Sequence, residues 1–109
     1  MPVPDTPQEI FENMPRYFRP EKAGDARLTL QFDLSGENGG TWTLTIAEGQ
    51  CQTWPGPAEN PDLTLNMTST DFVSLIKGQL NAVQAVMTGK IRFKGNITQA
   101  MNLMNWFEY

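Results

Sequence analysis

The side chains that most often carry out chemistry in enzymes are scarce in this chain. Among 109 residues there is no histidine and a single cysteine, Cys51. A triad with imidazole, a zinc site of the Cys/His type and an internal disulfide are therefore excluded. Asp62 and Asp71 have structural explanations, at a strand start and in a first helical turn. We predict a protein that is not an enzyme and holds no cofactor or metal, with catalysis by Asp or Lys groups as the least favoured alternative.

Positive charge gathers in one part of a chain that is acidic as a whole. The formal net charge of −4 argues against non-specific nucleic-acid binding, yet residues 72–107 contain no acidic side chain. Lys90, Arg92 and Lys94 stand at every second position and so share one face of a strand. That face is either a solvated surface paired with acids such as Asp33, or a patch that attracts anionic lipid surfaces. In the second case these three residues are candidates for membrane docking.

Flexible apolar side chains are concentrated in the same region. Met87, Met101 and Met104 belong to the last expected helices, and methionine adapts well to an irregular binding surface. Such residues usually fill a core. Together with inward strand positions such as Phe32 and Trp42, they also fit the lining of a lipid pocket.

The elements that would position these residues begin with a helix and a series of strands. The helix starts after Thr6 as N-cap, and its interior Pro15 predicts a break or kink near Asn13. Apolar and polar residues then alternate over residues 27–34, 41–48, 50–54 and 62–68. Glycine-bearing connections between the first three runs predict an antiparallel meander with one wet face.

The hydrophobic period changes in the second half of the chain. We expect a helix from the N-cap Ser69 or Thr70 to Gly78, where glycine can end it. A short helix, a strand and a final helix follow, over residues 82–87, 90–94 and from 97 onward. All helices are needed to cover the single apolar face of the sheet. The chain is therefore one domain, residues 1–109, of the two-layer α+β class.

Short segments spread over essentially the whole chain follow a characteristic order. In the second half they are residues 78–81 (GQLN), 85–87, 89–96 (GKIRFKGN) and 100–101. In the first half they are residues 11–23, 39–42 (GGTW), 48–49 and 61–65 (PDLTL). GKIRFKGN is moderately specific, and its position after GGTW and PDLTL makes the match strong. The chain resembles the sterol carrier protein 2 family, as a short free-standing member.

The resemblance implies a layer of helices over a mostly antiparallel five-stranded sheet, with a hydrophobic tunnel between the layers. It also implies non-catalytic binding and transfer of fatty acids, fatty acyl-CoA, sterols or phospholipids, of which a fatty acyl chain is the ligand we expect. The residues expected to line the tunnel are Phe32, Trp42, Ile46, Ile76, Leu80, Val83, Val86, Met87, Phe93, Met101, Met104 and Phe107.

The residues alone leave a different function open. The apolar cleft could receive a helix or chain end of a partner protein, which would make the chain an interaction or accessory module. The start of the chain has no secretory pattern, and no apolar run approaches the length of a membrane span. We therefore expect a cytoplasmic protein with transient contact at a membrane surface.

Overall fold

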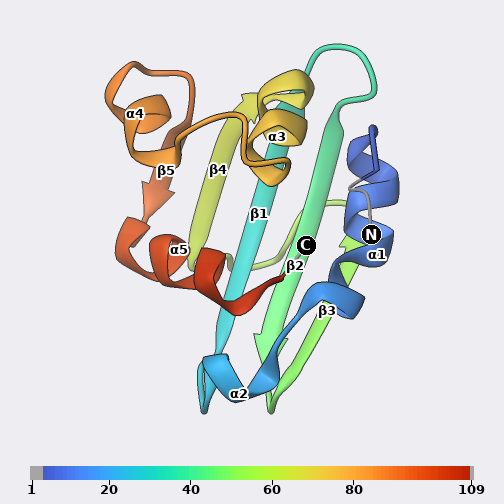
Figure 1. Ribbon diagram of the computed structural model, residues 1–109, viewed down its shortest axis with the longest axis vertical. Coiled ribbons are helices and arrows are strands. Elements are labelled where there is room, and N and C mark those ends of the chain that lie inside the picture. The colour runs from blue at the N-terminus through green and yellow to red at the C-terminus, as the bar shows by residue number, and fades with distance from the viewer. Residues whose placement is uncertain (1–3, 109) are drawn as a thin grey trace.

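The computed structural model describes residues 4–108, which form a five-stranded sheet with helices on one face (Figure 1). The strands lie in the order β3-β2-β1-β4-β5. In chain order the elements are α1 (Pro7–Tyr17), α2 (Pro20–Ala23), β1 (Leu28–Ser35), β2 (Gly40–Ala47), β3 (Gln50–Pro55), β4 (Leu63–Thr68), α3 (Ser69–Ile76), α4 (Ala82–Met87), β5 (Arg92–Gly95), α5 (Ile97–Leu103) and the 3-10 helix η1 (Met104–Trp106). The predicted two-layer α+β class is confirmed.

Alternation of apolar and polar residues sets the register of the sheet. Phe32 at the centre of β1 lies opposite Trp42 of β2 and Leu65 of β4, and these apolar side chains share the helix-covered face. β1 pairs antiparallel with β2 but parallel with β4, whereas β4 pairs antiparallel with β5. The sheet is therefore mostly antiparallel, as predicted, with one parallel pair at its centre.

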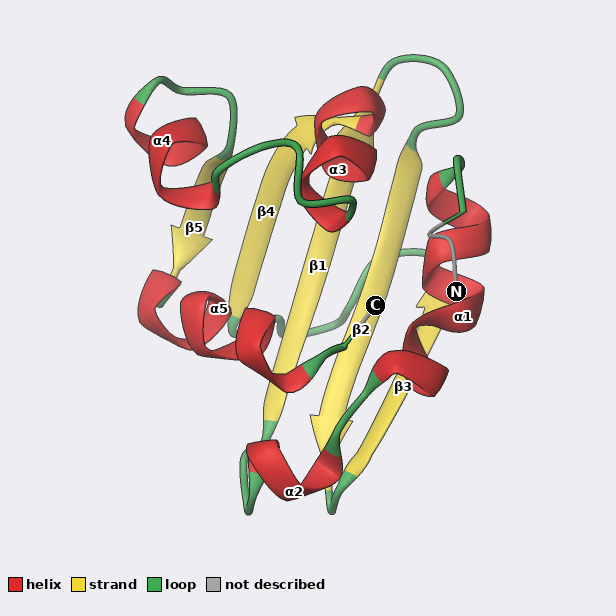
Figure 2. Ribbon diagram, viewed as in Figure 1, coloured by secondary structure: helices red, strands yellow, loops and turns green. Residues whose placement is uncertain are grey.

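The parallel pair requires the chain to cross from the β3 edge to the other side of β1. Figure 2 shows this connection, residues 56–62, passing behind the sheet, on the face without helices. Its Gly56 carbonyl accepts a hydrogen bond from Thr43 Oγ1 at 2.8 Å, and its Ala58 N donates to Gln31 Oε1 at 3.0 Å. Thr43 is fully buried. The predicted wet face is thus partly covered, because the crossover packs against it.

Threonine residues are the N-caps of α1 and α3, the first helices in the two halves of the chain. Thr6 before α1 accepts a hydrogen bond from the backbone N–H three residues later at 3.4 Å, as predicted. The N-cap of α3 is Thr68, which accepts from Asp71 N at 3.0 Å, and not the predicted Ser69 or Thr70. β4 therefore passes into α3 without an intervening loop.

Helix α1 continues through the position where a break was expected. It runs past Pro15 to its end at Tyr17, so the predicted break near Asn13 is wrong, while a kink there stays a prediction. Pro15 has no N–H to donate to the Phe11 carbonyl one turn earlier. Thr53 Oγ1 of β3 donates to that carbonyl instead, at 2.6 Å. A strand far along the chain thus replaces the missing helical hydrogen bond.

A cluster of aromatic rings fills the space beneath α1 and α3. The Phe11 ring stacks on Trp42 and on Phe72, each at a centroid distance of 4.9 Å, and meets Phe32 edge-on at 5.2 Å. Phe11 and Phe72 are fully buried. The interior on this side of Phe32 is therefore densely packed, in contrast to the side beneath α4 and α5.

The end of the helical layer is tied to the segment that follows α1. Phe18 and Phe107 form an isolated antiparallel bridge, and their rings lie 5.5 Å apart. The Glu108 carboxylate pairs with Arg19 Nε at 3.1 Å and with Lys22 Nζ at 2.7 Å. α5 and η1 are therefore held at both ends, by β5 on one side and by this bridge on the other.

Candidate functional site

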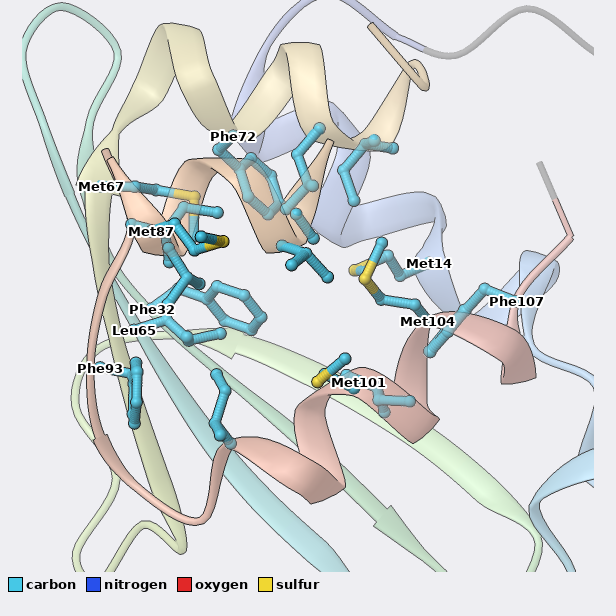
Figure 3. A pocket seen from close by; sticks show the side chains of 18 residues that line it. Met14, Phe32, Leu65, Met67, Phe72, Met87, Phe93, Met101, Met104 and Phe107 are labelled. Atoms are coloured by element: carbon cyan, nitrogen blue, oxygen red, sulfur yellow. The ribbon is translucent and has the colours of Figure 1, made fainter. Parts of the chain in front are cut away.

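A cavity of about 240 Å³ lies between the sheet and the helices α3, α4 and α5 (Figure 3). All of its lining residues are apolar. They are Met14, Phe32, Leu65, Met67, Phe72, Leu75, Ile76, Ala82, Val83, Val86, Met87, Ile91, Phe93, Ile97, Met101, Leu103, Met104 and Phe107.

Side chains point into the cavity from the strands, where every second residue shares a face, and from the helices, where residues three or four apart do. On the sheet, Leu65 of β4 stands in register between Phe32 of β1 and Phe93 of β5, and the three form part of the cavity floor. On α3, Phe72 and Ile76 are four residues apart and so share one face of the helix. The site is therefore built by the alternation and the helical spacing that also build the core.

Methionine is frequent around the cavity. Five of the six methionines of the chain line it, namely Met14, Met67, Met87, Met101 and Met104. Figure 3 shows them on several sides of the cavity, on elements from both layers. Met14 and Met67 are buried, whereas the other three are exposed. Because methionine is unbranched and flexible, these walls can adapt to ligands of different shape.

The structure places nine of the twelve predicted tunnel residues at this cavity. They are Phe32, Ile76, Val83, Val86, Met87, Phe93, Met101, Met104 and Phe107. Trp42 lies outside it because its ring stacks on Phe11. Ile46 lies opposite Cys51 and is buried in the core, and Leu80 packs against the core from the connection between α3 and α4. These three do not line the cavity, and contact of the predicted residues with a ligand stays a prediction.

Nine further lining residues were absent from the prediction. They are Met14, Leu65, Met67, Phe72, Leu75, Ala82, Ile91, Ile97 and Leu103. Most of these nine residues belong to a regular pattern of apolar positions, such as Leu65 in its strand and Phe72 in its helix. The period shows that a side chain points inward. It does not show which inward side chains face an unfilled space, and that depends on where α4 and α5 lie.

The cavity opens to solvent between α4, β5 and the last helices. Lining residues on these elements are exposed, namely Val83, Met87, Phe93, Met101 and Met104. Lining residues of the sheet centre and α1, such as Phe32 and Met14, are buried. The cavity therefore has a closed floor and an apolar mouth.

Three cations lie beside the mouth, on or next to β5. Lys90, Arg92 and Lys94 are exposed, and the ion pairs found among residues 4–108 do not involve them. Arg92 lies opposite Asn66, which is itself opposite Asp33. Asp33 instead accepts a hydrogen bond from within its own strand, at 3.0 Å. The expected pairing of the cations with Asp33 is therefore not observed.

The site offers binding without reactive groups. Its lining has no titratable side chain, and no cluster of three His, Cys, Asp or Glu residues occurs within the described part of the chain. Cys51 lies outside the cavity, and its burial raises the pKa of the thiol to about 12, so the nucleophilic thiolate is scarce near neutral pH. What the cavity can do is shield an apolar molecule from water.

The sequence model of the SCP-2 sterol transfer family matches residues 19–108. The chain belongs to the SCP-2 sterol transfer family. The match spans every element from α2 to η1, including all the strands and the three helices around the cavity. The resemblance inferred from the sequence is therefore confirmed.

Members of the family and structures with its fold include larger proteins. Hydroxysteroid dehydrogenase-like protein 2 of Mus musculus is 34% identical over 97 residues, which are 88% of this chain and 20% of the relative. The sec-alkylsulfatase Pisa1 from Pseudomonas sp. superposes with a TM-score of 0.85 at 17% identity, over 95% of this chain and 16% of that one. Palmitated Sterol Carrier Protein 2 Like 2 from Aedes aegypti superposes with a TM-score of 0.67 at 18% identity, over 90% of this chain and 86% of that one. This chain thus spans about a fifth of the curated relative.

Proposed function

We propose that this protein binds lipids in the apolar cavity and transfers them without transforming them. The observation that carries the proposal is the cavity itself, about 240 Å³ lined by apolar side chains alone. If it stayed empty, a space of this size would cost about 6 kcal/mol, which is comparable to the stability of a small domain. Occupancy by lipid, or partial filling by methionine side chains, removes that cost.

The ligand we propose is a fatty acyl chain, as a fatty acid or acyl-CoA, with sterols and phospholipids as further members of the class. The cavity lining has no hydrogen-bonding side chain, so the polar head of the lipid stays at the mouth while the apolar chain occupies the floor. The palmitated state of the Aedes aegypti protein supports an acyl chain as a ligand of this fold.

The proposal describes residues 1–109 as one lipid-binding domain that acts in the cytoplasm, without catalysis and without a cofactor. No helix within residues 4–108 is long and apolar enough to span a bilayer. The chain corresponds to a fifth of hydroxysteroid dehydrogenase-like protein 2, and this favours a second candidate function. In that case the domain is an accessory module whose cleft serves a partner protein.

Lipid extraction tests the proposal directly. The purified protein is denatured, extracted with organic solvent and analysed by mass spectrometry, and the delipidated protein is then titrated with a fluorescent fatty acid. We expect a co-purified lipid and saturable binding at micromolar concentration. Absence of both results would contradict the proposal. Stoichiometric capture of a single partner protein by a chain that binds no lipid would favour the accessory module.

A further inference from the structure

Nearly all exposed large apolar side chains of the described residues surround the mouth of the cavity. Met87 is 80% exposed, and Val83, Phe93, Met101 and Met104 are between 41% and 51% exposed. These five residues, which we call the rim, come from α4, β5, α5 and η1. The sixth exposed side chain, Trp54, lies on β3 at the opposite edge of the sheet. Contiguous exposed apolar residues of this kind mark an interaction surface.

The electrostatic surroundings of the rim differ from those of the rest of the chain. Residues 72–107, which contain the whole rim, have no acidic side chain, although the protein has a net charge of −4. Arg92 and Lys94 of β5, and Lys90 shortly before it, alternate with residues that line the cavity, and they have no acidic partner among the described residues. By alternation Arg92 and Lys94 face away from the cavity, but β5 is an edge strand, so these cations belong to the same sheet edge as Phe93 of the rim. The rim is thus apolar with a cationic border.

We propose that the rim inserts into the headgroup region of an anionic phospholipid membrane, with the cavity mouth facing the bilayer. The inference rests on the proposed lipid binding, because in this orientation an acyl chain passes between bilayer and cavity without crossing water. Apolar insertion and electrostatic attraction together provide the two signals that stable membrane attachment needs. Since the protein as a whole is acidic, a surface without acidic side chains also favours this orientation at an anionic membrane.

A second copy of the chain is a less suitable occupant of this surface. In a symmetric dimer the same patch meets itself, so two sets of the cations at Lys90, Arg92 and Lys94 would be brought together without an acidic counterpart. An anionic bilayer neutralises these charges and accepts the apolar side chains at the same time.

The electrostatic part is tested with delipidated protein and sedimented vesicles, either of pure phosphatidylcholine or of phosphatidylcholine and phosphatidylglycerol in equal parts. Arg92→Glu should weaken binding to the mixed vesicles by up to about 30-fold, because each basic residue near the surface contributes about fivefold. Arg16→Glu is the matched control, since it changes the charge equally on α1, beside the opposite edge of the sheet. It should bind much more tightly than Arg92→Glu.

The apolar part is tested by Met87→Lys, which removes an inserted side chain and adds a positive charge. Insertion of the rim predicts weaker binding to the mixed vesicles, whereas attraction of charges alone predicts stronger binding. Trp54→Lys is the matched control, because it removes an exposed apolar side chain and adds the same charge away from the rim. Circular dichroism and a urea titration establish that each variant is folded.

The inference is overturned if the parent protein does not bind the mixed vesicles, or if Arg92→Glu and Arg16→Glu bind equally. It is also overturned if Met87→Lys binds the mixed vesicles more tightly than the parent does. A further contradicting result is a dimer in solution that covers the rim and that Met87→Lys dissociates. Fatty-acid affinity without vesicles is measured in parallel for the parent and for Arg92→Glu. Normal fatty-acid binding with failed docking would refute this inference alone, whereas loss of fatty-acid binding in the parent would refute the proposed function.

Discussion

Leu65 and Leu44 occupy comparable positions on the apolar face of the sheet, but only Leu65 lines the cavity. Leu65 is part of its floor, whereas Leu44 is fully buried outside it. The two residues therefore form a matched pair in which the same substitution has opposite consequences.

Leu44→Trp should lower the free energy of unfolding by about 1–3 kcal/mol, because the packed core has no room for an indole. Leu65→Trp should leave it unchanged or raise it, since the indole enters existing space. In that variant fatty-acid affinity should fall by about 200-fold if the indole displaces four methylenes at about 0.8 kcal/mol each. Urea titrations beside fatty-acid titrations measure both effects. Equal destabilisation by the two substitutions would mean that the cavity is not available volume.

At the scale of elements, α1 depends on β3 for one of its hydrogen bonds. Thr53→Val removes the donor to the Phe11 carbonyl and should cost about 1–3 kcal/mol. In a Pro15→Ala background the helix supplies its own N–H to that carbonyl, so Thr53→Val should cost less there. A double-mutant cycle in urea measures the coupling. Thr64→Val on β4 is the control, and it should cost the same in both backgrounds; equal costs for Thr53→Val would refute this coupling.

Pro15 also shows what the sequence can and cannot predict about the elements. Alternation and capping residues predicted every strand and the start of α1, because these signals are local. The rescue of the Phe11 carbonyl by Thr53 depends on a contact between positions 42 residues apart, which no local pattern reveals. The predicted final helix is present as α5, but it does not reach Phe107 as an α-helix. The chain continues as η1, and Phe107 is extended and pairs with Phe18.

The candidate site, too, could be predicted only in part from the sequence. The inward direction of Phe32 and Trp42 was predictable from alternation, and both do face the helices. Phe32 nevertheless lines the cavity while Trp42 stacks beneath α1. Which of two adjacent inward side chains meets empty space depends on the distance between helices, and that distance is set by the whole molecule.

At the scale of the whole molecule, Glu108 links the end of the chain to the segment after α1. Hydrogen bonds from Lys22 and Arg19 hold the pKa of its carboxyl below the usual 4.5. A lowered pKa in the folded state stabilises the fold above the unfolded pKa, and this contribution is lost as the pH falls through the folded value.

Glu108→Gln should therefore reduce stability near pH 7, and its effect should disappear as the pH falls through the lowered pKa of the parent carboxyl. The effect should be small and should shrink in salt, because the pair is exposed. Urea midpoints at several pH values measure it. Glu21→Gln, an exposed neighbour on α2, is the control. If the urea midpoints of the parent and of Glu108→Gln differed by the same amount at both ends of the pH range, the charge would have no role.

The methionines around the cavity differ in exposure, so we expect them to differ in sensitivity to oxidants. Mild peroxide should convert Met87, Met101 and Met104 to sulfoxides before Met14 and Met67, whose exposures are 2% and 5%. The first three place polar groups at the mouth without disturbing the core, so fatty-acid affinity should decline before the free energy of unfolding does. Peptide mass spectrometry along the course of oxidation orders these events, and simultaneous loss of both properties would contradict it. Under the proposed function, oxidation at the mouth would release the bound lipid while the protein stays folded, and methionine sulfoxide reductases would reverse the change.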